Sequence, residues 1–386
     1  MNDNKIYCTR RRTDSGVTEK KHIGIFGGVF NPPHIGHLAV AECARDFLNL
    51  NTVYWVPSGN PPHKRISDQV SKEMRLKLVN AVVEGNSSFR IFADEMERGG
   101  ITYSIETARK IKKLNPDSEI YFLLGTDAYI SLPTWQSIDE LMRLVHFVVY
   151  PRGRESAPNL KSSHAIFLDA HNVDLSSSDI RDKLSILCSV RYLVPEAVLQ
   201  IIEDEALYTS ELNSGMRKHI DAVERASVYL AELWGIPPWA ARLAAKYHDA
   251  YKSFSAVECV KILERRGEIP DDFERKSAPL LHGKVAAERI EMIAQRRGYD
   301  DSIWSDIANA VRYHTTGREG MSELEKLLMV ADRFGKDWNE LSEIPVNPKV
   351  AIRFVLKRKM EILKQKGVVP LPAAISACRE HGVEIQ

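Results

Sequence analysis

The sequence predicts an α/β domain built on a parallel β-sheet, followed by an all-α domain. Three observations support this fold class. Short apolar runs alternate with amphipathic segments in the first half of the chain, as in parallel sheets covered by helices on both faces. A glycine pair at residues 27–28 ends the first apolar run. Beyond about residue 175 no convincing strand follows, and helical periodicity continues toward the end of the chain.

The predicted elements follow a polar, aperiodic tail at residues 1–20. Strand-like runs are expected at 23–26, 52–57, 89–95, 119–125, 147–152 and 165–169. Helix-like segments lie between them at 38–48, 73–84, 105–114 and 138–145. The all-α half shows helical periodicity at 217–235, 237–251, 281–298, 302–315 and 322–335. The change of character near 205–215 predicts one domain over 21–208 and a second over 209–386.

The composition is that of a soluble globular protein, and a cytoplasmic location is expected. Lys and Arg number 53 against 52 Asp and Glu, so the net charge near +1 gives no support for binding nucleic acid or a membrane. The five cysteines are scattered without a Cys-x-x-Cys pair, which favours a reducing compartment. No signal peptide or membrane-spanning stretch is expected. Neither nucleic acid nor a membrane is therefore an expected partner, whereas a homo-oligomer is left open.

The segment from Gly27 to His37 follows the first predicted strand and opens a helix. Glycines at the carboxyl end of a strand let the backbone turn tightly and approach a phosphate closely. The helix N-terminus supplies N–H groups and a partial positive charge. His34 and His37, three residues apart, can donate to the same phosphate chain. This layout can stabilise charge on a triphosphate during displacement without a covalent nucleophile.

A second anion site is predicted at residues 176–181, where serines precede an arginine one turn into a helix. A serine-rich N-cap alone would explain this segment equally well. Together with the His-x-Gly-His motif, however, it resembles the signatures of the nucleotidyltransferase superfamily, although Leu175, Ser178 and Val29 depart from the usual residues. The resemblance implies a Rossmann-like sheet and Mg²⁺-ATP as donor. It implies catalytic roles for His34, His37 and Arg181, and ATP contacts from Gly27, Gly28, Val29, Phe30, His34, Gly36, His37, Ser176, Ser177, Ser178, Ile180 and Arg181.

The middle of the domain carries further motifs at 62–64, 102–107, 125–135 and 149–152. Together they resemble bacterial nicotinate-nucleotide adenylyltransferases over about residues 22–208. That resemblance implies nicotinate mononucleotide as the acceptor, deamido-NAD and pyrophosphate as products, and a role in NAD biosynthesis. It implies substrate contacts, with Lys64 also catalytic, from Lys64, Thr102, Tyr103, Ser104, Thr107, Gly125, Asp127, Trp135 and Arg152.

Residue chemistry fits these roles. Trp135 can stack on a flat pyridine ring, and Asp127 can hold ribose hydroxyls. Backbone N–H groups near Tyr103 and Ser104 can bind the nicotinate carboxylate, while Lys64 and Arg152 suit a phosphate. Each residue alone also fits a plainer role, as core, turn or solvated surface. A preference for the nicotinamide nucleotide remains an open alternative.

The second half places ligand-type residues on separate helices: His219, His248, Asp249, His282, His314 and Asp332. Imidazoles and carboxylates suit first-row transition metals, which can activate water against a phosphate. An adjacent histidine and aspartate inside the apolar helix at 237–251 is hard to explain by packing, because burying an unpaired carboxylate is costly.

The order of these ligands resembles that of the HD-domain phosphohydrolases. The segments at 280–283, 313–317 and 321–332, with Lys252 three residues after Asp249, narrow the resemblance over about residues 215–380 to the HD-domain hydrolases that cut diadenosine tetraphosphate into two ADP. The resemblance implies a dinuclear centre of Fe²⁺/Fe³⁺, or Mn²⁺. Asp249 would bridge, with His219, His248 and Asp332 on one ion and His282 and His314 on the other. Asp249 and Lys252 would be catalytic. The stretch at 333–341 departs from the family pattern after Asp332, so the resemblance does not predict which residues form that edge of the substrate pocket.

Three interpretations remain. The chain is a bifunctional enzyme, or an adenylyltransferase whose HD domain only regulates, or a sibling transferase for another substrate such as phosphopantetheine with an HD domain acting on nucleic acid. The complete ligand set disfavours the second. The motifs at 102–107 and 125–135, together with the near-neutral charge, disfavour the third.

Overall fold

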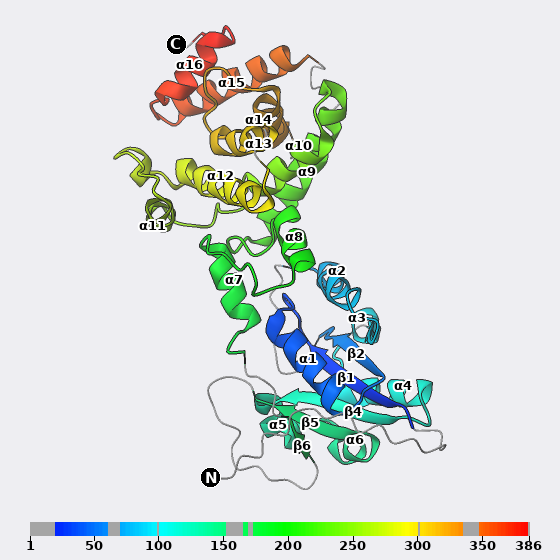
Figure 1. Ribbon diagram of the computed structural model, residues 1–386. Helices are drawn as coiled ribbons and strands as arrows, with labels where there is room; N and C mark the ends of the chain where they lie inside the picture. Colours follow the sequence, from blue (N-terminus) through cyan, green and yellow to red (C-terminus); the bar gives the residue numbers. More distant parts are fainter. Residues whose placement is uncertain are drawn as a thin grey trace. The chain divides into compact units, whose positions relative to one another are not determined.

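The computed structural model describes residues 20–60, 70–98, 100–151, 165–168, 173–299, 302–334 and 347–384 (Figure 1). The chain divides into two compact units, Met1–Lys183 with Ser189–Ile201 and Leu184–Cys188 with Ile202–Gln386. The first unit is α/β, and the described part of the second is helical, so the predicted fold class is confirmed. The division at Ile201 precedes the expected boundary at Tyr208, and the limits of the independently folding domains stay a prediction.

The first unit contains a parallel six-stranded sheet in the order β3-β2-β1-β4-β5-β6. β1 pairs with both β2 and β4, so the chain winds outward from β1 in one direction and from β4 in the other. Ligands of such sheets bind beyond the carboxyl ends of the strands where the winding reverses. The strands are β1 His22–Gly28, β2 Thr52–Pro57, β3 Phe89–Ile91, β4 Glu119–Gly125, β5 His146–Tyr150 and β6 Ala165–Phe167.

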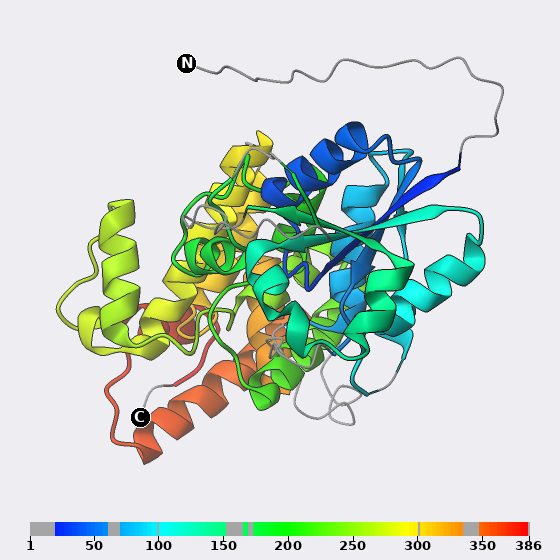
Figure 2. The same ribbon diagram turned by 90° about the horizontal axis from the view of Figure 1, so that it is seen from below.

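Helices of this unit cover both faces of the sheet. Successive strand residues point to opposite faces, so the apolar residues of a strand need a helix layer on each face to be buried. Ile23 and Ile25 of β1 share one core cluster with α4 (Ser104–Leu114) and α6 (Ile138–Leu144). α1 (Ile35–Phe47) contacts β1 and β2, and α2 (Lys72–Val83) contacts β2 and β3. Figure 2 turns the ribbon and shows helices of this unit on either side of the strands. The remaining segments are α3 Asp94–Glu97, α5 Thr126–Ser131, η1 Leu132–Thr134, α7 Ser177–Ser185 and α8 Glu196–Asp204.

The predicted run at 89–95 is too long as a strand. β3 ends at Ile91, and the acidic residues after it form the short helix α3. Acidic side chains favour the first turn of a helix because of its partial positive charge. This helix places Glu95 and Met96 in the interior, where both contribute to the site described below.

The second unit packs its helices around one apolar core. Alanines on the buried face of α10, among them Ala241, Ala244 and Ala245, let neighbouring helices approach closely. A smaller cluster joins α14, α15 and α16. Among the described residues, no helix is long and apolar enough to cross a membrane. The helices are α9 Ser214–Trp234, α10 Pro238–Tyr247, α11 Ala256–Arg266, η2 Glu274–Lys276, α12 Ala278–Arg297, α13 Ser302–Tyr313, α14 Glu323–Phe334, α15 Pro348–Gln365 and α16 Pro372–Glu380.

Candidate functional sites

The carboxyl ends of β1 and β4 meet where the winding of the sheet reverses. Gly27 and Gly28 end β1, and Gly125 ends β4. A methyl group added to Gly27 would find no atom within 4 Å, so the backbone there borders open space. The sequence motifs at these glycines therefore lie where a doubly wound sheet binds its ligand.

The loop after β1 is held by a buried aromatic side chain. Phe30 adopts φ of 48° and is 1% exposed. Its ring packs 5.5 Å from Phe26, 5.0 Å from Trp55 and 5.1 Å from the imidazole of His37. A non-glycine residue in this left-handed region is strained, and the surrounding packing has to compensate. The buried ring of Phe30 therefore anchors the loop to the interior of the unit.

His34 and His37 lie together at the start of α1. The backbone N–H of His34 donates to Nδ1 of His37 at 3.1 Å, and the ring centroids are 3.7 Å apart. His34 is buried, whereas His37 is half-buried. A methyl group on Gly36 would lie 3.0 Å from the His34 ring, so a residue without a side chain fits there. The two imidazoles therefore form one unit beside a helix N-terminus.

The second predicted segment packs against this loop. Ser177 donates from its hydroxyl to the carbonyl oxygen of Pro32 at 2.8 Å. Arg181 donates to the carbonyl oxygen of Asn31 at 2.8 Å and to the hydroxyl of Ser178 at 3.0 Å. The structure thus brings together two segments that lie about 145 residues apart in the chain, around two helix N-termini.

Two residues of the second segment have structural roles as well. The hydroxyl and backbone N–H of Ser176 both donate to the Asp179 carboxylate, at 2.6 and 2.8 Å, and these bonds lower the pKa of Asp179. The side chain of Ile180 is fully buried, so only its backbone can reach a nucleotide. The interpretation of this segment as an N-cap is therefore correct for Ser176.

The expected acceptor residues lie at the starts of α4 and α5. Tyr103 caps α4, and Asp127 is exposed in the first turn of α5, directly after β4. The half-buried indole of Trp135 packs edge-on against Phe122 at 6.1 Å and donates to the Ser131 hydroxyl at 3.3 Å. One part of the Trp135 side chain therefore belongs to the core. Lys64 and Arg152 lie outside the described residues.

Two buried charged residues support these segments and were missed by the sequence analysis. Arg75 is 1% exposed and donates to the backbone carbonyl oxygens of Val29 at 3.1 Å and Ser58 at 2.8 Å. Its position in α2, on the buried face with Leu78 and Val79, was a usable signal. Glu95 accepts hydrogen bonds from two threonines near the start of α4. No feature of the acidic sequence of α3 distinguishes Glu95 as the buried glutamate.

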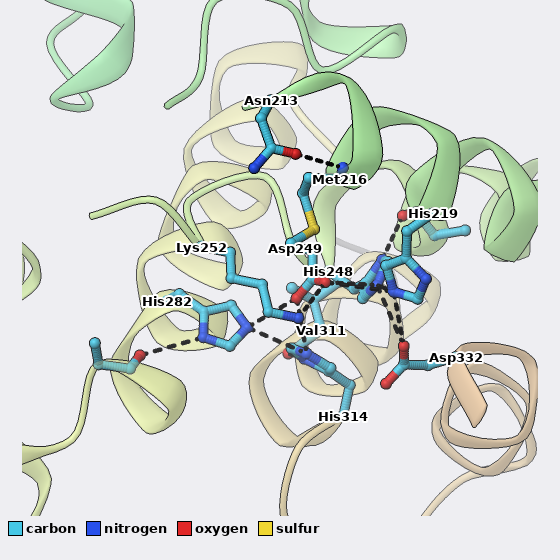
Figure 3. A network of polar contacts seen from close by, with 12 residues as sticks. Asn213, Met216, His219, His248, Asp249, Lys252, His282, Val311, His314 and Asp332 are labelled. Carbon is cyan, nitrogen blue, oxygen red and sulfur yellow. Dashed lines mark hydrogen bonds and ion pairs between the residues drawn. The ribbon is translucent and has the colours of Figure 1, made fainter. Parts of the chain in front are cut away.

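Figure 3 shows the second site, where side chains from separate helical regions converge. His219 lies on α9, and the pair His248–Asp249 directly follows α10, which ends at Tyr247 and not at residue 251 as expected. His282 lies on α12, His314 follows α13 and Asp332 lies on α14. Of the six, His248, Asp249, His282 and His314 are buried.

These side chains form two triangles that meet at Asp249. In one, His282 and His314 face each other at 3.3 Å, and lie 3.1 and 3.7 Å from Oδ1 of Asp249. In the other, Nε2 of His219 lies 3.4 Å from Nε2 of His248 and 3.0 Å from Oδ1 of Asp332. Oδ2 of Asp249 is 3.4 Å from both His219 and His248. Each carboxylate oxygen of Asp249 thus faces a different histidine pair.

Backbone carbonyl oxygens orient three of the imidazoles. In each, Nδ1 donates to a carbonyl oxygen three or four residues earlier: His248 to Ala245 at 2.7 Å, His282 to Ala278 at 3.2 Å and His314 to Val311 at 2.7 Å. A carbonyl can only accept, so Nδ1 carries a proton and Nε2 is the ring nitrogen that can bind a metal ion at the centre of the cluster.

The cluster fits two metal ions. Lone pairs that face one another and a carboxylate repel unless a cation lies between them. Ligands bound to one ion at ~2.1 Å stand roughly 3.0–3.5 Å apart, which is close to the separations within both triangles. The two groups His219, His248, Asp332 and Asp249, His282, His314 each have their ligand atoms within 4.8 Å of one another. The mixed nitrogen and oxygen donors suit iron, manganese or zinc.

The electrostatics of the cluster support ionised carboxylates. Burial by itself raises the pKa of Asp249, but the surrounding histidines more than reverse this effect and hold it well below its usual range. Interaction with Asp249 and then Asp332 raises the pKa of His219 to about 9. Burial lowers the pKa of His314 to about 4. Asp249 therefore offers a charged bridging ligand, and His314 offers a neutral ring.

Lys252 lies beside the cluster, with Nζ 2.6 Å from Oδ2 of Asp249, and its side chain is 43% exposed. An amine in this position neutralises part of the Asp249 charge and can reach a bound phosphate. Of the divergent stretch 333–341, Arg333 and Phe334 end α14, and the remaining residues lie outside the described part of the chain.

Comparisons with known proteins divide the chain in the same way. Residues 25–183 match the cytidylyltransferase-like family, and residues 216–337 match the HD domain family. A probable nicotinate-nucleotide adenylyltransferase of Lactiplantibacillus plantarum is 42% identical over 188 residues, covering 49% of this chain and 88% of the relative. The relative of the same name from Shouchella clausii is 41% identical over 188 residues, covering 49% and 97%.

One solved structure is a predicted HD superfamily hydrolase involved in NAD metabolism from Clostridium acetobutylicum. It is 22% identical, covers 54% of this chain and 97% of its own, and has a TM-score of 0.39.

Proposed function

The chain belongs to the nicotinate-nucleotide adenylyltransferase family and carries an HD domain after it, and from this premise we propose two reactions, one in each unit. The first unit transfers the adenylyl group of ATP to nicotinate mononucleotide. The second hydrolyses diadenosine tetraphosphate to two ADP. The first proposal is supported by relatives that are covered almost completely. The second is supported by the arrangement of five ligand residues around the sixth, Asp249.

In the transfer reaction, an oxygen of the mononucleotide phosphate attacks the α-phosphorus of ATP. The bond from the α-phosphorus to the bridging oxygen breaks, pyrophosphate leaves and deamido-NAD forms. Mg²⁺ bound with ATP neutralises part of the phosphate charge. His34, His37 and Arg181 supply donors toward the charge that develops on the phosphates, and the helix N-termini add backbone N–H groups.

The approach of residues 176–181 to the loop at 27–37 is the observation that carries this proposal. Ser177 and Arg181 fix that approach through two carbonyl oxygens, at the carboxyl end of β1. Both positive helix ends can then serve one polyphosphate and stabilise its charge during displacement at phosphorus.

Acceptor choice is the test of this proposal. The chain is incubated with Mg²⁺-ATP and either nicotinate or nicotinamide mononucleotide, and dinucleotide formation is measured. Donors placed for a carboxylate are poorly matched by a neutral amide, so we expect the nicotinate form to react with ~10²-fold higher kcat/KM. Equal efficiency with both would favour the alternative, a transferase for the amide nucleotide, and no product with either would refute the proposal.

In the hydrolytic reaction, a dinuclear centre, by our proposal iron or manganese, would supply an activated water. His219, His248 and Asp332 would hold one ion, His282 and His314 the other, and Asp249 would bridge both. Lys252 stands where it can bind a phosphate of the substrate. Water attacks one of the two central phosphorus atoms of the tetraphosphate chain and loses its protons to solvent. The bond from that phosphorus to the oxygen that bridges the two central phosphates breaks, so one ADP leaves with the bridging oxygen and the other ADP carries the oxygen of the water.

The alternative is an HD domain that only regulates the transferase. Incubation with diadenosine tetraphosphate and Fe²⁺, Mn²⁺ or Mg²⁺, followed by separation of nucleotides, distinguishes the two. ADP as the sole product supports symmetric hydrolysis. ATP with AMP would refute it, and an intact substrate under all three metals would favour the regulatory role.

A further inference from the structure

Glu95 is a buried carboxylate whose two oxygens are both engaged by threonine hydroxyls. It is 7% exposed. Thr102 donates to Oε2 at 3.1 Å, and Thr107 donates to Oε1 at 2.7 Å. An ionised carboxylate can only accept, so both hydroxyls are held as donors in one orientation. The two hydroxyl donors offset only part of the free energy that burial of a carboxylate costs. A less polar residue at this position would avoid that cost.

The two threonines lie on either side of the start of α4. Thr102 precedes the cap residue Tyr103, and Thr107 lies one turn into the helix. One carboxylate therefore spans the first turn and fixes the direction of its backbone N–H groups. One of them, the N–H of Glu106, donates to the carbonyl oxygen of Tyr103 at 3.0 Å. The N–H groups of Tyr103 and Ser104, at the very start of the helix, are the donors that the proposed acceptor site offers to the pyridine carboxylate.

The backbone of Glu95 is itself held tightly. A methyl group on Gly59 would lie 1.7 Å from the carbonyl oxygen of Glu95, so the loop after β2 packs directly on α3. The N–H of Thr102 donates to the carbonyl oxygen of Asn60 at 3.2 Å. Arg75, which binds the Val29 carbonyl oxygen in the loop at 27–37, also contacts the sulfur of Met96, the residue after Glu95, at 3.6 Å. Glu95 thus links the start of α4 to α3 and to the loop after β2, which pack directly on each other.

We propose that Glu95 is a positioning residue for acceptor selectivity, holding the N-terminal turn of α4 so that its N–H groups meet a pyridine carboxylate. The proposal rests on the proposed transferase function. Its consequence is selective: removing Glu95 weakens binding of an acceptor that carries the carboxylate. It has little effect on ATP, or on the amide nucleotide that lacks the anion.

The test measures KM and kcat of the full chain for nicotinate mononucleotide, nicotinamide mononucleotide and ATP. For Glu95→Ala we expect KM for nicotinate mononucleotide to rise about tenfold, while KM for ATP and for the amide nucleotide changes less than about twofold. Glu95→Gln keeps the volume and one acceptor oxygen, and should restore part of the loss. Glu97→Gln, an exposed neighbour in α3, is the matched control and should behave as wild type.

Thr107→Val removes one hydroxyl with little change of volume, and provides the test if Glu95→Ala does not fold. It should raise KM for nicotinate mononucleotide about threefold with the thermal midpoint nearly unchanged. An equal rise in KM for all three substrates, or none in any variant, would overturn the positioning role. Failure of the wild-type chain to use nicotinate mononucleotide would instead refute the transferase proposal, and the inference with it.

Discussion

The two sites are built in opposite ways. The candidate site in the first unit consists largely of backbone groups at helix starts and loop turns, and buried side chains such as Phe30 and Arg75 hold these segments in place. The cluster in the second unit is made of side chains, and the backbone only orients them, as the Val311 carbonyl does for His314. Replacement of a single side chain should therefore lower the activity of the first site only in part. Loss of a single metal ligand should abolish the activity of the second site.

Metal removal should give the largest difference between the two sites. After chelation and removal of the chelator, we expect hydrolysis of diadenosine tetraphosphate to fall by at least ~10³-fold, because activation of water depends on the ions. Transfer assayed with Mg²⁺-ATP should be unchanged. Metal analysis verifies the depletion, and Fe²⁺ or Mn²⁺ should restore hydrolysis. Full hydrolysis by verified metal-free protein would contradict the comparison.

Replacement of His37 by alanine should have a smaller effect. Removing one preorganised donor lowers turnover by roughly 10²–10³. Because the backbone donors remain, the transfer reaction should be slowed rather than abolished. The rate is measured with ATP saturating, and hydrolysis by the same protein serves as the control. A wild-type transfer rate would remove His37 from the mechanism.

Gly283→Ala should produce the smallest change and act on the second unit alone. The added methyl would lie 2.8 Å from the Val311 carbonyl oxygen, which holds His314. Overpacking of this kind destabilises by about 1–3 kcal/mol, and the displaced imidazole should reduce hydrolysis about tenfold. Gly85→Ala, where the nearest atom lies 3.8 Å away, is the control. Unchanged stability and hydrolysis in Gly283→Ala would show that α12 and α13 adjust freely.

The same contrast explains what could be predicted from the sequence. Metal ligands are recognised by their side-chain type, so the six ligand residues, of which His219 is the first and Asp332 the last, could be predicted from the sequence. In the structure these six side chains converge. The loop at 27–37 and the segment at 176–181 were also found, since glycine, histidine and serine suit helix starts. Arg75 and Glu95 were missed because their importance lies in burial and in backbone partners. The excess length given to β3 has a related cause, since the turn into α3 depends on tertiary packing.

Asp249→Ala in the full chain, with both reactions measured on one preparation, tests the central claim of two independent activities most directly. The substitution removes the ligand shared by both triangles. We expect loss of bound metal and of hydrolysis, because ligation and the structure of such sites are coupled. Transfer to nicotinate mononucleotide should stay within about twofold of wild type. A loss of transfer as large as the loss of hydrolysis would contradict the claim and make the HD domain a regulator.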